Sequence, residues 1–157
     1  MSRLRLDEKE LQDLTALSRE DGFPCELTDE VMALLDKNIA SNSFLLFGEY
    51  RGDDLAAIGA LSIFFVFPCP DSPCGLIGHI SGVYTHPKYR HQGLSAAIVD
   101  QIIDAGREAG CDYVCLDSPA DELYRKAGFI HAPENETRMW LPLHTRPEPH
   151  LNRQCKP

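Results

Sequence analysis

Hydrophobic positions in the first part of the chain recur at the spacing of helices. They predict one helix over residues 7–18 and a second that begins after Thr28, a good N-cap that is followed by acidic residues. A short strand over residues 2–6 precedes the first helix. The apolar positions are Leu11, Leu14 and Leu17 in the first helix, and Val31, Leu34, Leu35 and Ile39 in the second.

From residue 43 onward the pattern becomes one of strands. Strands are predicted over residues 43–50, 55–67 and 76–84, and the first two form a hairpin around a turn at 51–54. The loop at 68–75 holds three prolines. Gly82, inside the third strand, indicates a bulge or a close approach of another backbone.

Helices and strands alternate in the remainder. A long helix is predicted from Gly93 to Gly110, followed by a strand over 111–116, a short helix capped by Ser118, and strands over 129–131 and 138–143. The order β-α-α-β-β-β-α-β-α-β-β predicts a three-layer mixed α/β fold. We expect a single domain over residues 1–143. The proline-containing segment at 144–157 has few apolar residues, which predicts a loose C-terminal tail.

Composition and charge narrow the classes of partner. The chain has 157 residues, of which 43% are hydrophobic and 25% charged, which is enough for one domain with its own core. A formal net charge of -9 disfavours nucleic acid as a partner and suits a cationic substrate such as an amine. There is no signal-peptide pattern and no apolar run of membrane-spanning length. We therefore expect a cytoplasmic protein with no membrane partner and with its six cysteines reduced.

The cysteines and histidines do not predict a metal site. No two cysteines have the CxxC spacing, and no two histidines are four residues apart. A zinc site at Cys111 and Cys115 would need further ligands that the sequence does not place nearby. We expect no metal.

The most informative segment lies between the strand that ends near Tyr84 and the helix that follows Gly93. Arg90-x-x-Gly93-x-Ser95 places a cation and a glycine at a helix N-terminus, where unpaired N–H groups attract phosphate. Gly93 allows an anion to come close to the backbone, and Arg90 adds charge-assisted contacts. The GxGxxG and GxxxxGK[ST] fingerprints of nucleotide-binding loops are absent. The segment predicts a pyrophosphate cradle.

Two motifs resemble one known family. The segment at 83–95, Val-Tyr-Thr-His-Pro-x-Tyr-Arg-x-x-Gly-x-Ser, resembles motif A of the GNAT N-acetyltransferases, whose pattern is Q/R-x-x-G-x-G/A. The segment at 117–129, Asp-x-x-Ala-x-x-Leu-Tyr-x-x-x-Gly-Phe, is similar to the family's N-x-x-A-x-x-L-Y-x-x-x-G-F. The resemblance is specific over residues 76–129. It implies a GNAT-like α/β (α+β) fold with a mostly antiparallel sheet, helices on both faces and a splayed pair of central strands.

The same resemblance implies a co-substrate and a reaction. Acetyl-CoA, or another short acyl-CoA, would lie between the splayed strands, and its acetyl group would pass directly to a primary amine in a ternary complex. The acceptor, a small molecule or a protein amine, is left open, and homodimers are common among similar proteins. The residues implied in acyl-CoA binding are Val83, Tyr84, Thr85, Arg90, His91, Gln92, Gly93, Leu94, Ser95, Asp117 and Tyr124.

This chain departs from the family pattern at two of these positions. Ser95 stands where glycine or alanine is usual, and its small side chain still permits a close approach. Asp117 stands where asparagine is common. In related proteins that asparagine touches the cofactor, so the carboxylate puts this contact in doubt.

Three residues are candidates for the chemistry. Tyr124 matches the general acid of the family, although a tyrosine on a short helix also packs well on a sheet. His79 lies on the strand that leads into the cradle and is the candidate base, because an imidazole takes up protons near neutral pH. Its alternative is a strand histidine that faces solvent or has satisfied hydrogen bonds. Ser81 would share the face of His79 and relay a proton through water.

Two further functions compete with an acetyltransferase. The first is a non-catalytic sensor or scaffold that binds acyl-CoA on the same fold, which the presence of both Tyr124 and His79 disfavours. The second is a toxin that acetylates aminoacyl groups carried by nucleic acid, which the acidic balance disfavours.

Overall fold

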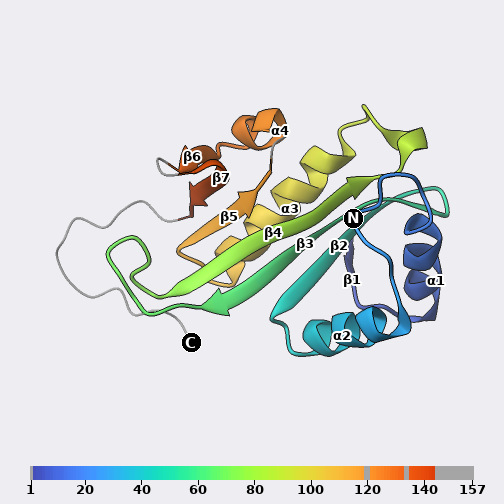
Figure 1. Ribbon diagram of the computed structural model, residues 1–157, viewed down its shortest axis with the longest axis horizontal. Coiled ribbons are helices and arrows are strands. Elements are labelled where there is room, and N and C mark those ends of the chain that lie inside the picture. Colours follow the sequence, from blue (N-terminus) through green and yellow to red (C-terminus); the bar gives the residue numbers. More distant parts are fainter. Residues whose placement is uncertain (1, 119–120, 133–134, 144–157) are drawn as a thin grey trace.

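The computed structural model describes residues 2–118, 121–132 and 135–143 (Figure 1). The predicted tail at 144–157 lies outside these residues. The strands are β1 (Ser2–Leu4), β2 (Phe44–Arg51), β3 (Asp54–Phe65), β4 (Leu76–Thr85), β5 (Tyr113–Asp117), β6 (Ile130–Ala132) and β7 (Asn135–Pro142). The helices are α1 (Glu8–Leu17), α2 (Asp29–Ala40), α3 (Leu94–Glu108) and α4 (Asp121–Lys126), with a 3₁₀ turn η1 at Pro87–Tyr89.

The described strands form one sheet in the order β1-β2-β3-β4-β5-β7-β6. Every neighbouring pair is antiparallel except β4 and β5, which are parallel and are joined through α3. Helices α1 and α2 lie together near β1 and β2, while α4 lies with β5, β6 and β7 at the other end (Figure 1). The three-layer, mostly antiparallel architecture expected from the sequence is confirmed.

Two hydrophobic clusters hold the layers together. One lies between the sheet and the α3–α4 layer, and its buried members include Ile98 and Ile102 of α3, Leu61 of β3 and Ile80 of β4. The other lies between the opposite face of the sheet and the α1–α2 layer, and includes Leu14 of α1. Burial on both faces explains why β2 and β3 are almost continuously apolar in sequence.

The expected splay of the central strands is present. The parallel pairing of β4 with β5 covers only Ile77–His79 and Tyr113–Cys115. Beyond these residues β4 continues to Thr85 and β5 to Asp117 without pairing with each other. The two strands therefore diverge after His79, and the far half of β4 is bonded to a strand on its β3 side only.

The bulge expected at Gly82 is also present. Ile58 of β3 lies opposite Tyr84, whereas Ala60 lies opposite Ser81, so Gly82 and its neighbour Val83 share the space opposite one residue. Gly82 has a φ of 61°, a left-handed conformation that glycine adopts without strain. The bulge changes the face to which the following side chains point.

Local chemistry explains where the elements begin and end. Asp7 and Glu10 form a reciprocal capping box at the start of α1, and Thr28 caps α2 as expected. Strand β5 begins at Tyr113, although the backbone of Asp112 still bonds to Leu76 and Leu143 on either side. The side chain of Asp112 joins a separate network. Its carboxylate accepts hydrogen bonds from Ser72 Oγ at 2.7 Å and from the amide of Cys74 at 3.0 Å.

The state of the cysteines differs from the expectation at one position. Cys25, Cys69, Cys111 and Cys115 are free thiols. Cys74 is disulfide-bonded, so the expectation that all the cysteines are reduced is wrong there. Among the described helices, none combines the length and apolar character that a membrane span requires.

The close packing of α3 on the sheet makes a specific prediction about Gly59 of β3. A Cβ at this position would lie 2.4 Å from Cγ2 of Ile98 and 3.2 Å from Cδ1 of Ile102. We expect Gly59→Ala to lower the free energy of unfolding by about 1–3 kcal/mol through overpacking, as measured by urea denaturation.

Gly52→Ala is the comparison for this measurement. Gly52 lies in the turn between β2 and β3 with a φ of 62°, and a Cβ there meets no described atom within 4 Å. Gly52→Ala should lower the free energy of unfolding by about 1 kcal/mol, because alanine is strained in the left-handed conformation and meets no packing clash there. Equal losses in the two variants would contradict the packing argument.

Candidate active site

The N-terminus of α3 is the predicted phosphate cradle. Gly93 precedes the helix with a φ of 77°, and His91 is also left-handed with a φ of 62°. Gly93 offers no side-chain cap, and no hydrogen bond found among the described residues uses an amide of residues 91–95 as its donor. His91, Gln92 and Gly93 are exposed. The helix end therefore presents several N–H groups, with the positive end of the helix dipole, to an anion.

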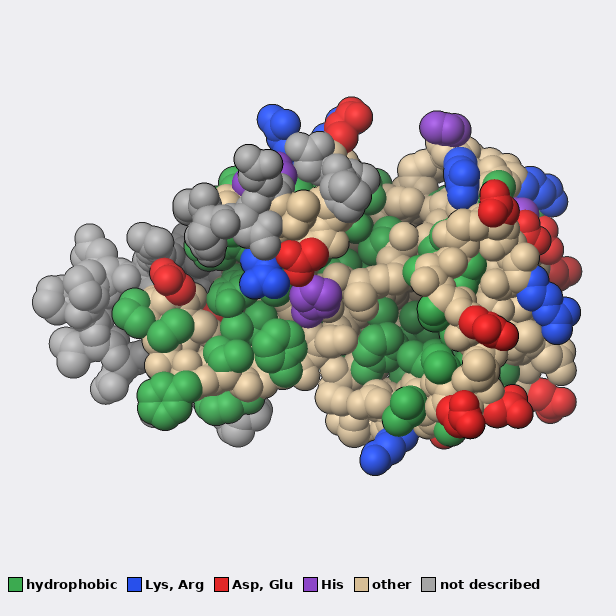
Figure 2. Space-filling model, in the orientation of Figure 1, with side chains coloured by type: hydrophobic (Ala, Val, Ile, Leu, Met, Phe, Trp, Pro, Cys, Tyr) green, Lys and Arg blue, Asp and Glu red, His purple; other side chains and the backbone are tan. Residues whose placement is uncertain are grey.

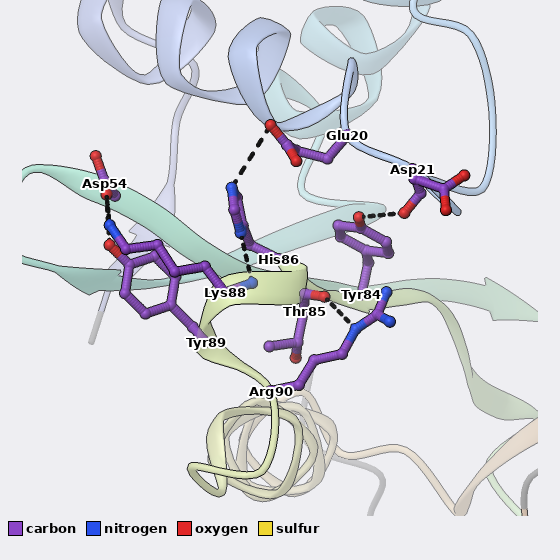
Figure 3. A network of polar contacts seen from close by, with 9 residues as sticks. All are labelled: Glu20, Asp21, Asp54, Tyr84, Thr85, His86, Lys88, Tyr89 and Arg90. Carbon is purple, nitrogen blue, oxygen red and sulfur yellow. Dashed lines mark hydrogen bonds and ion pairs between the residues drawn. The ribbon is translucent and has the colours of Figure 1, made fainter.

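The side chains around the cradle are tied to the end of β4. Thr85 Oγ1 and Ser95 Oγ are hydrogen-bonded at 2.8 Å, so the serine that replaces the usual small residue joins the strand to the helix. Arg90 Nε donates to the carbonyl oxygen of Thr85 at 3.3 Å. Figure 3 shows the Arg90 side chain lying back along the end of β4, near Tyr84. The guanidinium therefore lies near the segment after α1, where a Cβ at Gly22 would be 3.9 Å from its Nη2 atom.

The loop between β4 and α3 is braced from two sides (Figure 3). On one side Asp54, at the start of β3, accepts hydrogen bonds from the hydroxyl of Tyr89 and from Lys88 Nζ. The hydrogen bond from Tyr89 is the main reason that the pKa of Asp54 lies below its usual value, and Lys88 adds to the effect. Asp54, next to the turn between β2 and β3, therefore holds the loop between β4 and α3 in place.

The second brace joins this loop to the segment after α1. His86 Nδ1 accepts a hydrogen bond from the amide of Lys88 at 3.1 Å, and His86 Nε2 lies 3.6 Å from Glu20 Oε1. The hydroxyl of Tyr84 donates to the carbonyl oxygen of Asp21 at 2.8 Å. The segment between α1 and α2 is thus bonded directly to the strand and loop that lead into the cradle.

His79 lies where β4 and β5 separate. Its neighbour Ile80 points into the cluster under α3, so His79 and Ser81 face the opposite side of the sheet, as the strand pattern predicts. The side chain of His79 is 36% exposed. Its Nε2 atom lies 3.8 Å from Oδ2 of Asp117, the last residue of β5.

Asp117 is held by a partner that sequence reasoning did not identify. Arg138 of β7 lies opposite Asp117 and donates from Nε to Oδ1 at 3.2 Å and from Nη2 to Oδ2 at 3.1 Å. This pair lowers the pKa of the Asp117 carboxyl. On the face seen in Figure 2, a histidine, a basic and an acidic side chain meet between two hydrophobic areas. The family motif contains Asp117 but ends before Arg138, so only strand pairing reveals the contact.

Tyr124 of α4 lies in the cluster on the face of the sheet opposite to His79. It is 7% exposed, belongs to the cluster under α3, and makes an edge-to-face contact with Phe129 at 5.8 Å between ring centroids. Its hydroxyl has no hydrogen-bond partner among the described residues, yet it is not one of their fully buried, unpaired polar atoms. The hydroxyl therefore keeps contact with solvent. Burial raises the pKa of Tyr124, so the phenol stays protonated at neutral pH.

Four other predicted site residues differ in their burial and in the face of the sheet on which they lie. Val83 is half-buried against the cluster under α3, and Leu94 is buried in that cluster. Tyr84 is buried on the opposite face, where it contacts Phe23 edge to face at 5.1 Å. Any contact of Tyr84 or Leu94 with a ligand would have to use the backbone. Ser81 is exposed and lies opposite Ala60.

The arrangement defines a class of protein. A helix N-terminus without a side-chain cap lies at the end of a strand that diverges from its parallel neighbour, with His79 on one face of the sheet and Tyr124 on the other. Residues 9–129 match the acetyltransferase (GNAT) family, and the chain belongs to this family. The family uses acetyl-CoA as its acetyl donor.

The relatives and structural neighbours agree with this membership. The chain is 39% identical over 67 residues to glucosamine 6-phosphate N-acetyltransferase of Trypanosoma brucei brucei. That match covers 41% of this chain and 45% of the relative, which is less than half of its length.

Solved structures share the fold at lower identity. Glucosamine-6-phosphate N-acetyltransferase of Arabidopsis thaliana has a TM-score of 0.67 at 22% identity, covering 83% of this chain and 92% of its own. An acetyltransferase of Clostridium acetobutylicum, solved with acetyl-CoA, has a TM-score of 0.64 at 19% identity, covering 81% of this chain and 82% of its own.

The burial of Tyr124 makes a prediction about its titration. Because burial disfavours the phenolate, this tyrosine should ionise only above pH 10, later than an exposed tyrosine. The measurement is the phenolate absorbance of the native chain minus that of Tyr124→Phe, with circular dichroism at each pH to verify folding. A difference signal that develops below pH 10 would contradict the burial argument.

Proposed function

We propose that this protein transfers an acetyl group from acetyl-CoA to a primary amine by direct attack in a ternary complex. The observation that carries the proposal is the gap between β4 and β5, which opens at His79 and runs toward the N-terminus of α3. Acyl transfer from a coenzyme A thioester requires a site for the donor phosphates, a base and an acid. In this member of the family, the N-terminus of α3, His79 and Tyr124 are the candidates for these three parts.

The cradle and the free side of β4 would hold the donor. The amides of residues 91–95 and the Arg90 guanidinium suit the pyrophosphate of coenzyme A. Backbone groups of Val83 and Thr85 on the side that β5 has left suit the amides of the pantetheine arm. The Clostridium acetobutylicum structure, which was solved with acetyl-CoA, supports the fit of this fold to that donor.

His79 would prepare the nucleophile. A lysine-like amine has a pKa of about 10.4 and must lose a proton before it attacks. His79 accepts this proton on the open face as the amine nitrogen bonds to the carbonyl carbon. Ser81, exposed on the same face, would pass the proton through water where the amine lies beyond reach of the imidazole.

Tyr124 would complete the transfer on the other face. As the bond between the carbonyl carbon and sulfur breaks, the phenol gives its proton to the sulfur and leaves free coenzyme A as a thiol. As the amide forms, its nitrogen loses a second proton to water and the phenolate regains one from water, while His79 releases the proton it took from the ammonium group to solvent. The net change is one protonated amine and one thioester converted into one amide, one thiol and one proton.

The acceptor is proposed only as a primary amine. The two glucosamine 6-phosphate N-acetyltransferases among the similar proteins make glucosamine 6-phosphate the first amine to test. A screen should add polyamines, amino acids, aminoglycosides and peptides, with free thiol as the readout. Binding of acetyl-CoA without thiol release for any amine would favour a sensor or scaffold instead.

The roles of Tyr124 and His79 predict losses in turnover. We expect Tyr124→Phe and His79→Ala each to lower kcat by about 100-fold, as removal of a general acid or base does, with KM for acetyl-CoA within about twofold of the native value. The assay is thiol release at saturating acetyl-CoA. Native turnover in His79→Ala would remove it as the base.

The role of Arg90 predicts a loss in donor affinity. We expect Arg90→Gln to weaken acetyl-CoA binding about tenfold in calorimetry, as the loss of one charge-assisted contact implies. Arg107→Gln, at an exposed arginine in the last turn of α3 paired with Asp104, is the matched control and should bind normally. Equal affinities of Arg90→Gln and the native chain would place the pyrophosphate elsewhere.

A further inference from the structure

We propose that Asp117 is a positioning residue that orients His79 and stabilises its protonated form, and that Arg138 holds Asp117 in place for this task. The inference rests on the proposed function, because it concerns the base of that reaction. Its starting point is a departure from the family motif, since Asp117 stands where asparagine is common.

Strand geometry brings the three side chains to one place. Asp117 ends β5 two residues after Cys115, which is the last residue paired with β4 and lies opposite His79. Asp117 and Cys115 share a face, so the carboxylate lies on the open side of the sheet with the imidazole. Arg138 is the direct partner of Asp117 on β7. The carboxylate thus has a neighbour on each side, one from β7 and one from β4.

The pair with Arg138 restricts the carboxylate. Both oxygens accept from the guanidinium, at 3.1 and 3.2 Å, and a bidentate contact fixes the plane of the carboxylate as well as its position. An asparagine would present one oxygen and one NH2 group, and because the guanidinium has only donors, the same two-oxygen contact could not form. Aspartate at position 117 therefore forms the bidentate contact with Arg138, which the asparagine that is common in the family would not form.

The atom of His79 that faces this carboxylate is Nε2, at 3.8 Å from Oδ2. A negative charge beside Nε2 favours the tautomer with its proton there, which leaves the lone pair on Nδ1 to accept the proton of the amine. When Nδ1 takes that proton, the resulting positive charge lies beside the carboxylate and is stabilised by it.

The other groups packed beside His79 do not supply this charge. Its partner on β3 is Ser62, and its partner on β5 is Cys115, whose thiol has a pKa raised by burial and stays neutral. Asp117 lies 3.8 Å from the imidazole, and Arg138 is bonded to Asp117 on its other side. Their effects on His79 have opposite signs.

The opposite signs provide the test. The acid limb of kcat against pH reports protonation of the base in the ternary complex. Asp117→Asn removes the negative charge and should move this limb down by about half a pH unit, with kcat about tenfold lower. Arg138→Gln leaves the carboxylate without its cation and should move the limb up by a similar amount. Asp117→Glu keeps the charge and should return the limb toward its native position.

Two comparisons separate positioning from other roles. Asp104→Asn breaks an exposed ion pair with Arg107 on α3, makes the same change in charge, and should leave the limb unmoved. A contact of Asp117 with the donor would instead raise KM for acetyl-CoA and leave the limb unchanged. That result, or a limb that stays at its native pH in Asp117→Asn, would overturn the inference.

A measurement without substrate separates this inference from the proposed function. The ¹⁵N signals of the His79 ring should show the proton on Nε2 in the native chain and a mixture of tautomers in Asp117→Asn. Native turnover, together with ring signals that are the same in Asp117→Asn as in the native chain, would refute the positioning role but not the proposed acetyltransferase activity. Ring signals that depend on Asp117, with no thiol release from any amine, would refute the proposed function instead.

Discussion

The divergence of β4 from β5 after three paired residues is the constraint on which the rest of the site depends. Parallel strands need a crossover, and here α3 provides it, so the same connection that permits the parallel pair also delivers a helix N-terminus to the end of β4. The bulge at Gly82 then turns the last residues of β4 relative to β3. A fully paired strand would have no free backbone edge and no passage between the two faces of the sheet.

The polar groups around this gap are stabilised by contacts between segments far apart in the sequence. Asp54 from β3 and Glu20 from the segment after α1 both reach the loop between β4 and α3, through Tyr89 and His86. Exposed pairs of this kind contribute little stability one at a time, typically below about 1 kcal/mol. Their value lies in limiting the positions that an exposed loop can take, which a site for a long, flexible donor requires.

The site combines residues that follow the GNAT family pattern with residues that depart from it. The donor side keeps the family pattern in Arg90 and Gly93, and the structure supports each with the expected local geometry. The departures, Ser95 and Asp117, have both acquired a partner within the chain, Thr85 in one case and Arg138 in the other.

The sequence by itself determined the order of the elements, the cap of α2 and the glycine bulge, because each follows from neighbouring residues through spacing or backbone preference. It also indicated that Ser81 and His79 share a face, since alternation along one strand is a local property. Only the tertiary structure revealed that Asp117 lies between Arg138 and His79, and that Asp54 braces Tyr89. Those contacts depend on strand register and on packing between distant segments, as in Arg138 with Asp117, 21 residues apart, and Tyr89 with Asp54, 35 residues apart. Neither periodicity nor local propensity predicts contacts between residues so far apart in the sequence. The cluster of His79, Asp117 and Arg138 could therefore be recognised only from the strand pairing.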